Sequence, residues 1–330
     1  MRLTFLIGNG LDLQYGLKTT FKDFFDYIMN NNVLEEENYI YRKFLNKNPE
    51  EDWSDFEYIL GRLTFDLEKD NITSNIFMDD LDDFRDVFID YMNIQQELFK
   101  VDKNEKNNIL ANTAKNYYLN LNYSSRLSIK NLIDQSNDVQ IDILNFNYTD
   151  TLKKIFDASN TTFSLWNKTH TFKNHIYVHR TLEDGTFLGV NDTSQLNSEA
   201  FTSIDLDGLI KPRMIQSDID ENSEKLNDII NLSNVIYIFG MSLGDTDKIW
   251  WERIKKWLEK STYNRLIINY YIDDKRYTSS KKHLNKKNKI YAEARNKFYD
   301  HFEMTEDEKR IFDEKIFISL NSSNIFTKSK

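Results

Sequence analysis

The sequence predicts an α/β protein with a mostly parallel sheet and one large all-helical insertion between the first and second strands. Short apolar runs rich in strand-forming residues recur along the chain, and several are followed by helical patterns. Alternation of strands and helices is typical of parallel sheets. Residues 21–137, by contrast, contain little but apolar side chains at helical spacing, such as Phe21, Phe24, Phe25 and Ile28.

The expected strands follow from these apolar runs, taken in chain order. They are residues 2–7, 139–146, 174–178, 186–190, 233–239, 265–272 and 315–320. The first strand lies far from the second along the chain, so the helical block interrupts the sheet rather than preceding it. We therefore expect a discontinuous sheet domain, residues 1–20 and 138–330, and a helical insertion, residues 21–137.

The composition excludes several classes of protein. The chain has 330 residues and no cysteine, which excludes disulfide scaffolds, thiol nucleophiles and cysteine zinc sites. No segment reaches the ~20 apolar residues that span a bilayer, and the N-terminal apolar run is too short for a secretory signal. We expect a cytoplasmic protein without membrane segments. Only 9 residues are glycine. We therefore expect each glycine to occupy a position where the backbone conformation or a close approach requires it.

Polar residues cluster where four expected strands end. The clusters are Gly8 to Asp12, Asn147 to Asp150, His179, and Gly240 to Asp247. Open parallel sheets bind ligands at the carboxyl ends of their strands. We therefore expect these clusters to form one site.

The first cluster, Gly8-Asn9-Gly10, is half of a dinucleotide-type turn. Two glycines let the backbone approach a phosphate closely, and Asp12 is expected either to cap the next helix or to bind ribose hydroxyls. Leu13 stands where the full motif has its third glycine. A tight turn with a purely structural role is the alternative.

The second and third clusters carry the expected catalytic groups. An amide at a strand end, such as Asn147, is well placed to orient a ribose or a water molecule, whereas Thr149 or Asp150 can instead cap a helix. His179 directly follows a strand, where a general base or a ribose contact is plausible. The histidine spacing does not suit a metal, and we expect none.

The fourth cluster joins a strand to a helix. Gly240, Ser242 and the amides that follow can hold a phosphate or a ribose at a helix start, and capping by Asp245 or Thr246 is the alternative. In the insertion, a Trp such as Trp53 is most often a core residue. Glu57, one helical turn later, could face the site.

The C-terminal part of the chain is basic. Residues 275–289 contain no acid and carry Lys275, Arg276, Lys281, Lys282, Lys286, Lys287 and Lys289. Such a run can contact the phosphates of a nucleic acid or an acidic partner. A solvated helix face is the alternative.

With these clusters assembled, the chain resembles the bacteriophage abortive-infection AbiH family. The likeness rests on IGNGLDLQYGLKTTFKDF (7–24), WSDFE (53–57), FNYTDTL (146–152), GVND (189–192) and GMSLGDTD (240–247). The family usually has His-Gly where this chain has His179-Arg180. The resemblance implies a role in defence against phage.

AbiH-like sequences look in turn like distant relatives of the sirtuin-like, Rossmann-like NAD-binding fold. This likeness implies that Asn147 and His179 are catalytic, and that NAD is bound by Gly8, Asn9, Gly10, Asp12, Thr149, Asp150, Gly240, Ser242 and Asn269. Thr149 stands where sirtuins have a carboxylate, with Asp150 one residue late. The sirtuin zinc module has no counterpart.

The polar clusters and the two resemblances lead to three hypotheses about function. The first is hydrolysis of NAD to nicotinamide and ADP-ribose on infection. The second is a nucleotide-binding sensor or scaffold without hydrolysis, with residues 275–289 contacting nucleic acid or a partner. The third is a metal-dependent nuclease built on Asp12, Asp150 and Asp247. We also expect a homo-oligomer, and a phage trigger or a defence protein as partner.

Overall fold

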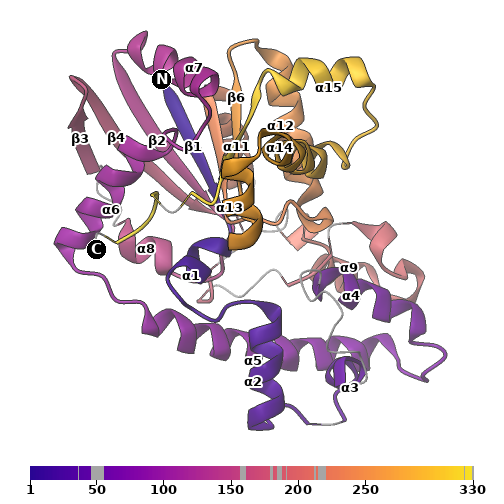
Figure 1. The fold of residues 1–330 in the computed structure, drawn as a ribbon. Helices are drawn as coiled ribbons and strands as arrows, with labels where there is room; N and C mark the ends of the chain where they lie inside the picture. The colour runs from indigo at the N-terminus through magenta and orange to yellow at the C-terminus, as the bar shows by residue number, and fades with distance from the viewer. Residues whose placement is uncertain are drawn as a thin grey trace.

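The computed structural model describes residues 1–35, 37–45, 56–156, 161–178, 181–183, 188–190, 192–211, 213–214, 221–322 and 324–328. Its centre is a seven-stranded sheet in the order β3-β4-β2-β1-β5-β6-β7 (Figure 1). The strands are β1 (Arg2–Ile7), β2 (Asp138–Asn145), β3 (Thr161–Leu165), β4 (Lys168–Tyr177), β5 (Val235–Phe239), β6 (Arg265–Tyr270) and β7 (Ile316–Leu320). β3 pairs antiparallel with β4, and the other pairs are parallel.

The order of the parallel strands defines where a ligand is expected. From β1 the chain adds β2 and β4 on one side, then returns to add β5, β6 and β7 on the other. Leaving out β3, this is the 3-2-1-4-5-6 order of Rossmann folds, which bind ligands where the order reverses. The reversal lies between β1 and β5, which pair directly.

Two strand predictions differ from the structure. The hairpin of β3 and β4 extends the sheet beyond the predicted start at residue 174; its turn residues Trp166 and Asn167 have φ of 53° and 61°, as a type I′ turn requires. The strand predicted at residues 186–190 is wrong within residues 188–190, where Val190 forms a single bridge with Ile210. Leu188 and Val190 are apolar because they enter the core of a helical layer, not the sheet.

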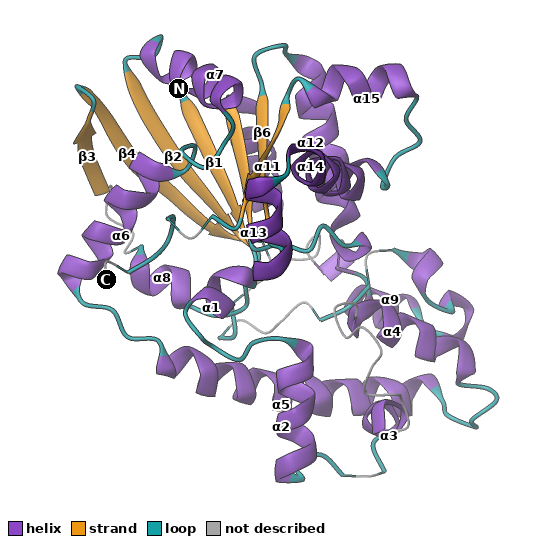
Figure 2. Ribbon diagram, viewed as in Figure 1, coloured by secondary structure: helices purple, strands orange, loops and turns teal. Residues whose placement is uncertain are grey.

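Helices cover both faces of the sheet (Figure 2). One core contains α1 (Gly10–Gln14), α6 (Lys103–Asn116), α7 (Tyr123–Asp134) and α8 (Thr151–Ile155). The other contains α11 (Glu221–Leu232), α12 (Lys248–Lys260), α14 (Leu284–Tyr299) and α15 (Glu306–Asp313). Because both faces are covered, every residue of β5 and β7 is buried, which explains the continuous apolar sequence of β5.

A third core belongs to a helical layer, defined here as α2 to α5 together with the described residues of the range 182–210. Its helices are α2 (Phe21–Asn31), α3 (Tyr39–Leu45), α4 (Phe56–Leu63), α5 (Ser74–Leu98) and α9 (Ser203–Leu209). Phe24 of α2 packs edge-on against Phe84 and Phe88 of α5. Figure 1 shows this layer beyond the carboxyl ends of the strands. The layer therefore faces the edge where the site is predicted.

The helices between β1 and β2 divide between two cores. α6 and α7 pack on the sheet, whereas α2 to α5 form the helical layer with residues 182–210. The predicted domain boundaries, at residues 20 and 138, stay a prediction. None of the helices in the described ranges combines the length and apolar character needed to cross a membrane.

Candidate functional site

A cavity of about 1290 Å³ lies between the carboxyl edge of the sheet and the helical layer. Its walls include the loops after β1, β5 and β6, with Phe21 and Lys22 from α2 and Glu57 from α4. Small-molecule sites usually measure about 300–1,000 Å³, so a dinucleotide has room here. Six of the predicted ligand-binding residues line the cavity: Gly8, Asn9, Gly10, Gly240, Ser242 and Asn269.

The glycines of the first and fourth clusters pack against each other. A Cβ on Gly10 would lie 2.4 Å from the Cα of Gly240, and one on Gly8 would lie 2.7 Å from the Gly240 carbonyl oxygen. Gly240 also has φ of +68°, which side chains disfavour. These glycines therefore bring the β1 and β5 loops together, and the structural alternative for Gly8 and Gly10 is part of their role.

The β1 and β5 loops also carry backbone N–H groups that are available as hydrogen-bond donors. The N–H groups of Asn9, Met241 and Ser242 have no acceptor within the described part of the chain, and all three residues line the cavity. The Asn9 side chain is engaged elsewhere, donating to the Thr19 carbonyl oxygen at 2.9 Å. N–H groups without an acceptor in the wall of one cavity suit an anion such as a phosphate.

The buried side-chain amide of Asn147 has no hydrogen-bond partner among the described residues. Its backbone N–H donates to Oδ1 of Asn145 at 3.0 Å, but within the described ranges its own Oδ1 and Nδ2 make no hydrogen bond. Its neighbours Phe146 and Tyr148 line the cavity. An unsatisfied buried polar group costs about 1–3 kcal/mol, so Asn147 is suited to bind a ligand or an ordered water.

Asp12 and Thr149 bind each other instead of lining the cavity. The Thr149 hydroxyl donates to Oδ2 of Asp12 at 2.6 Å. Burial raises the pKa of Asp12 to about 6, although the hydrogen bond from Thr149 opposes this shift. The helix-capping alternative for Asp12 is wrong, because Asp12 lies inside α1 and turns to Thr149. A carboxylate therefore does accompany Thr149, supplied by α1.

In the second and fourth clusters, Asp150 and Asp245 do not act as the helix caps that the alternative readings predicted. Asp150 occupies the N-cap position of α8, but its side chain makes no capping bond and lies 3.0 Å from the Lys154 ammonium. Asp245 likewise makes no cap and lies 3.1 Å from Nδ1 of His301. The Thr246 side chain lies outside the described residues. His301 also contacts the Leu243 carbonyl oxygen at 2.9 Å through Nε2, which fixes the β5 loop.

The sequence did not single out Lys211, yet it lines the cavity beside Glu57. Lys211 Nζ lies 2.5 Å from Oε2 of Glu57, and both side chains are buried. The Tyr148 hydroxyl donates to Oε1 of Glu57 at 3.4 Å. The expectation that Glu57 could face the site is met. The signal for Lys211 was slight: a lysine directly after the apolar pair Leu209-Ile210.

The positions of two predicted residues and of the predicted acidic cluster are the last to be compared with the structure. His179 and Trp53 lie outside the described residues. Across the described ranges, no three His, Asp or Glu side chains gather in a group that could hold a metal ion. Asp12, Asp150 and Asp247 therefore do not assemble the acidic centre of the nuclease hypothesis.

A parallel sheet in Rossmann order, with a large cavity at the reversal of strand order, defines a class of α/β ligand-binding proteins. The family described as bacteriophage abortive infection AbiH matches residues 4–270, and the chain belongs to that family. The match runs from β1 to β6 and includes all the motifs of the resemblance. It indicates an anti-phage role in abortive infection. The search of curated proteins found no match.

Proposed function

We propose that this AbiH protein binds NAD in the cavity and hydrolyses it during phage infection. The observation that carries the proposal is the cavity itself, which lies at the reversal of strand order and is lined by six residues predicted to bind NAD. The sirtuin-like character of the fold is part of this proposal.

The reaction needs few chemical groups. The bond between the anomeric carbon and the nicotinamide nitrogen breaks, its electron pair goes to that nitrogen, and water adds to the ribose. Asn147 would orient the ribose and the water, and N–H groups of Asn9, Met241 and Ser242 would bind the pyrophosphate. Asn269 would hold the adenosine half. His179, outside the described residues, stays the proposed base that contacts the ribose hydroxyls.

A second candidate is a nucleotide sensor that does not hydrolyse its ligand. Two observations favour it. The Asp12 carboxylate is engaged by Thr149 and does not line the cavity, and a basic helix adjoins the cavity through Asp274 and Tyr277 of α13 (Asp274–Lys282). Ligand binding at the same site without release of nicotinamide would identify this function.

The first test is chromatography of NAD incubated with the purified protein, with and without lysate from phage-infected cells. Nicotinamide and ADP-ribose should appear with the wild type and not with Asn147→Ala, whose thermal stability should stay nearly unchanged. The control is Asn264→Ala, another buried amide, which donates to the Trp257 carbonyl oxygen at 2.7 Å. That variant should lose stability and keep turnover. Equal turnover by Asn147→Ala and wild type would contradict the proposal.

A further inference from the structure

Three distant parts of the chain meet in one wall of the cavity. Glu57 comes from α4, Tyr148 follows β2, and Lys211 follows α9. Glu57 and Lys211 form an ion pair at 2.5 Å with side chains 7% and 6% exposed. The ion pair thus lies on the side of the helical layer, and the Tyr148 hydroxyl, which donates to Glu57 at 3.4 Å, joins it to the segment after β2.

A buried ion pair needs a reason. Removing two charges from water is expensive, and their attraction often only balances that expense. Three acidic residues of the described ranges line the cavity. Of these, Glu57 is buried, Asp247 is half-buried and Asp274 is exposed. Buried charges in a cavity wall are typical of functional sites.

We infer that Glu57 is the carboxylate that contacts the ribose of the bound nucleotide, and that Lys211 holds this carboxylate in position. The inference rests on the proposed function and adds the negative charge that the reaction needs. As the bond to nicotinamide breaks, positive charge develops on the ribose, and a nearby carboxylate stabilises it. Water then bonds to the anomeric carbon and gives one proton to Glu57, which releases it to solvent.

The test compares Glu57→Gln with Lys211→Met and Lys211→Arg, measuring nicotinamide release, NAD binding by calorimetry and thermal stability. Glu57→Gln should lower the turnover number by about 100-fold, while NAD still binds and the protein stays folded. Lys211→Met should lose turnover similarly, and Lys211→Arg should recover most of it. Recovery distinguishes positioning from a loss of fold.

The matched control is Asp142→Asn. Asp142 is also a buried carboxylate, paired with Arg2 at 2.5 Å, but it lies in the middle of β2, opposite Thr4, and does not line the cavity. This variant should lose stability and keep turnover. If the double variant Glu57→Gln/Lys211→Met, which leaves no unpaired charge, is folded and as active as wild type, the inference is wrong.

The outcomes separate the two proposals. If the wild type neither binds nor cleaves NAD in any lysate, the proposed function is wrong, and this inference is wrong with it. A wild type that binds NAD without cleaving it, with binding equal in Glu57→Gln, also overturns the ribose contact. An active wild type with an equally active Glu57→Gln overturns this inference alone.

Discussion

At the scale of single residues, Asp12 shows how burial changes the role of a motif. Its position after the glycine turn suggested a helix cap or a contact with ribose. Instead its carboxylate is buried against the Thr149 hydroxyl. The pKa of Asp12 rises to about 6 because burial disfavours the charged form.

This pKa makes a prediction about stability and pH. Since the folded pKa exceeds the unfolded one, the contribution of Asp12 to stability is fully present below pH 4 and is lost as the pH rises through 6. A rise of the pKa of Asp12 to about 6 corresponds to about 3 kcal/mol of stability. Asp12→Asn should therefore be more stable than wild type at pH 8 and lose this advantage at pH 4.

Urea unfolding at both pH values measures the difference, with Asp86→Asn on the exposed face of α5 as control. A stability difference for Asp12→Asn that does not grow with pH would contradict the shift.

Residues inside motifs could be predicted, and isolated ones could not. Gly8, Gly10 and Gly240 stand out because the chain is poor in glycine, and Asn147 because it follows an apolar strand. Lys211 belongs to no motif. It reaches the cavity only because the bridge between Val190 and Ile210 holds that segment against the helical layer.

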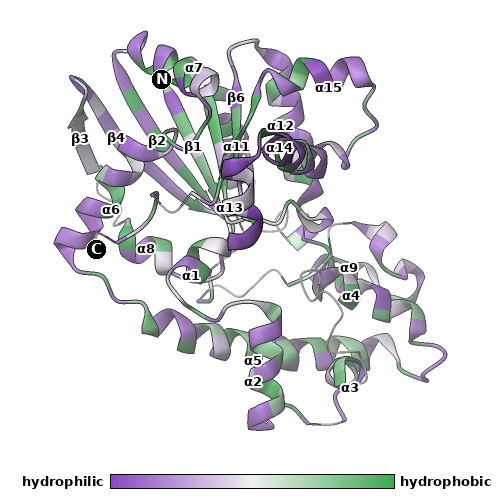
Figure 3. Ribbon diagram, in the orientation of Figure 1, coloured by the Kyte–Doolittle hydropathy of each residue, from purple (hydrophilic) through white to green (hydrophobic). Residues whose placement is uncertain are grey.

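At the scale of secondary-structure elements, α13 and the start of α14 form a basic surface. Lys281, Lys282, Lys286 and Lys289 are exposed, and Figure 3 shows α13 mostly in hydrophilic colours. Lys281 lies over the ring of Tyr277 at 4.0 Å, and Tyr277 lines the cavity. The predicted solvated face is thus present, beside the site, and a bound polyanion would reach the mouth of the cavity.

This surface predicts how nucleic acid would bind. Replacing Lys281, Lys282, Lys286 and Lys287 by Gln should weaken binding of single-stranded RNA and make its salt slope shallower by about 3. Fluorescence anisotropy across a range of salt concentrations measures the slope. The control replaces four lysines of α6 and α7: Lys103, Lys106, Lys115 and Lys130. Equal salt slopes for the two quadruple variants would show that this basic surface does not bind nucleic acid.

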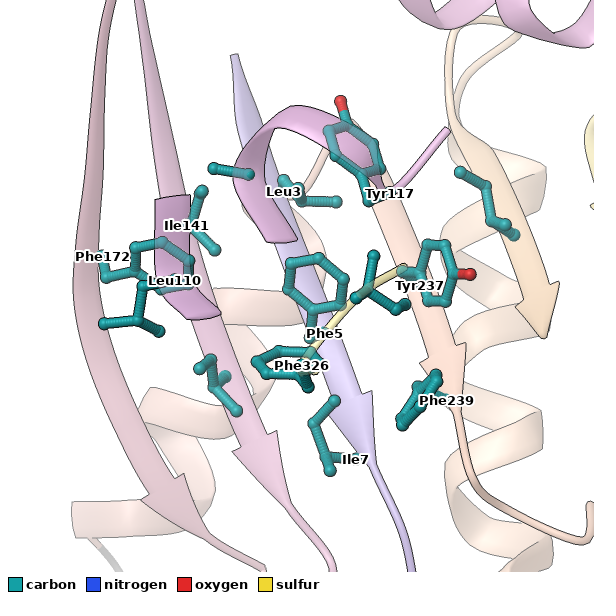
Figure 4. Packing of buried hydrophobic residues seen from close by; sticks show 14 of the residues in the cluster. Leu3, Phe5, Ile7, Leu110, Tyr117, Ile141, Phe172, Tyr237, Phe239 and Phe326 are labelled. Carbon is teal, nitrogen blue, oxygen red and sulfur yellow. The ribbon is translucent and has the colours of Figure 1, made fainter. Parts of the chain in front are cut away.

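At the scale of the whole molecule, the C-terminal segment closes the core. Phe326 is fully buried, with its ring centroid 5.2 Å from that of Phe5. Figure 4 shows the two rings beside each other. Its backbone N–H donates to the Thr113 hydroxyl at 2.8 Å. Earlier in the same segment, the Ser322 N–H donates to Oδ1 of Asn269 in the cavity wall at 3.1 Å. The tail therefore links the sheet core to the site.

Phe326→Ala should lower the free energy of unfolding by about 3–5 kcal/mol, the range for removing a buried aromatic ring. Because the tail also holds Asn269, ligand binding should weaken as well. Denaturant unfolding tests the first effect and calorimetry the second. Leu284→Ala, at a side chain that is 71% exposed, should change stability by less than about 0.5 kcal/mol. A Phe326→Ala variant as stable as wild type would show that the tail does not close the core.

Local sequence patterns were enough to predict the α/β class, five of the seven strands within two residues, the second part of β4, and the edge of the sheet where the first, second and fourth polar clusters lie. These features are local, because they depend on apolar runs and on the residues that directly follow them. The packing of glycines from two loops, the bond between Asp12 and Thr149, and the pairing of Glu57 with Lys211 became visible in the folded structure alone. Each of these is a contact between distant segments, and one sequence carries no spacing that encodes it.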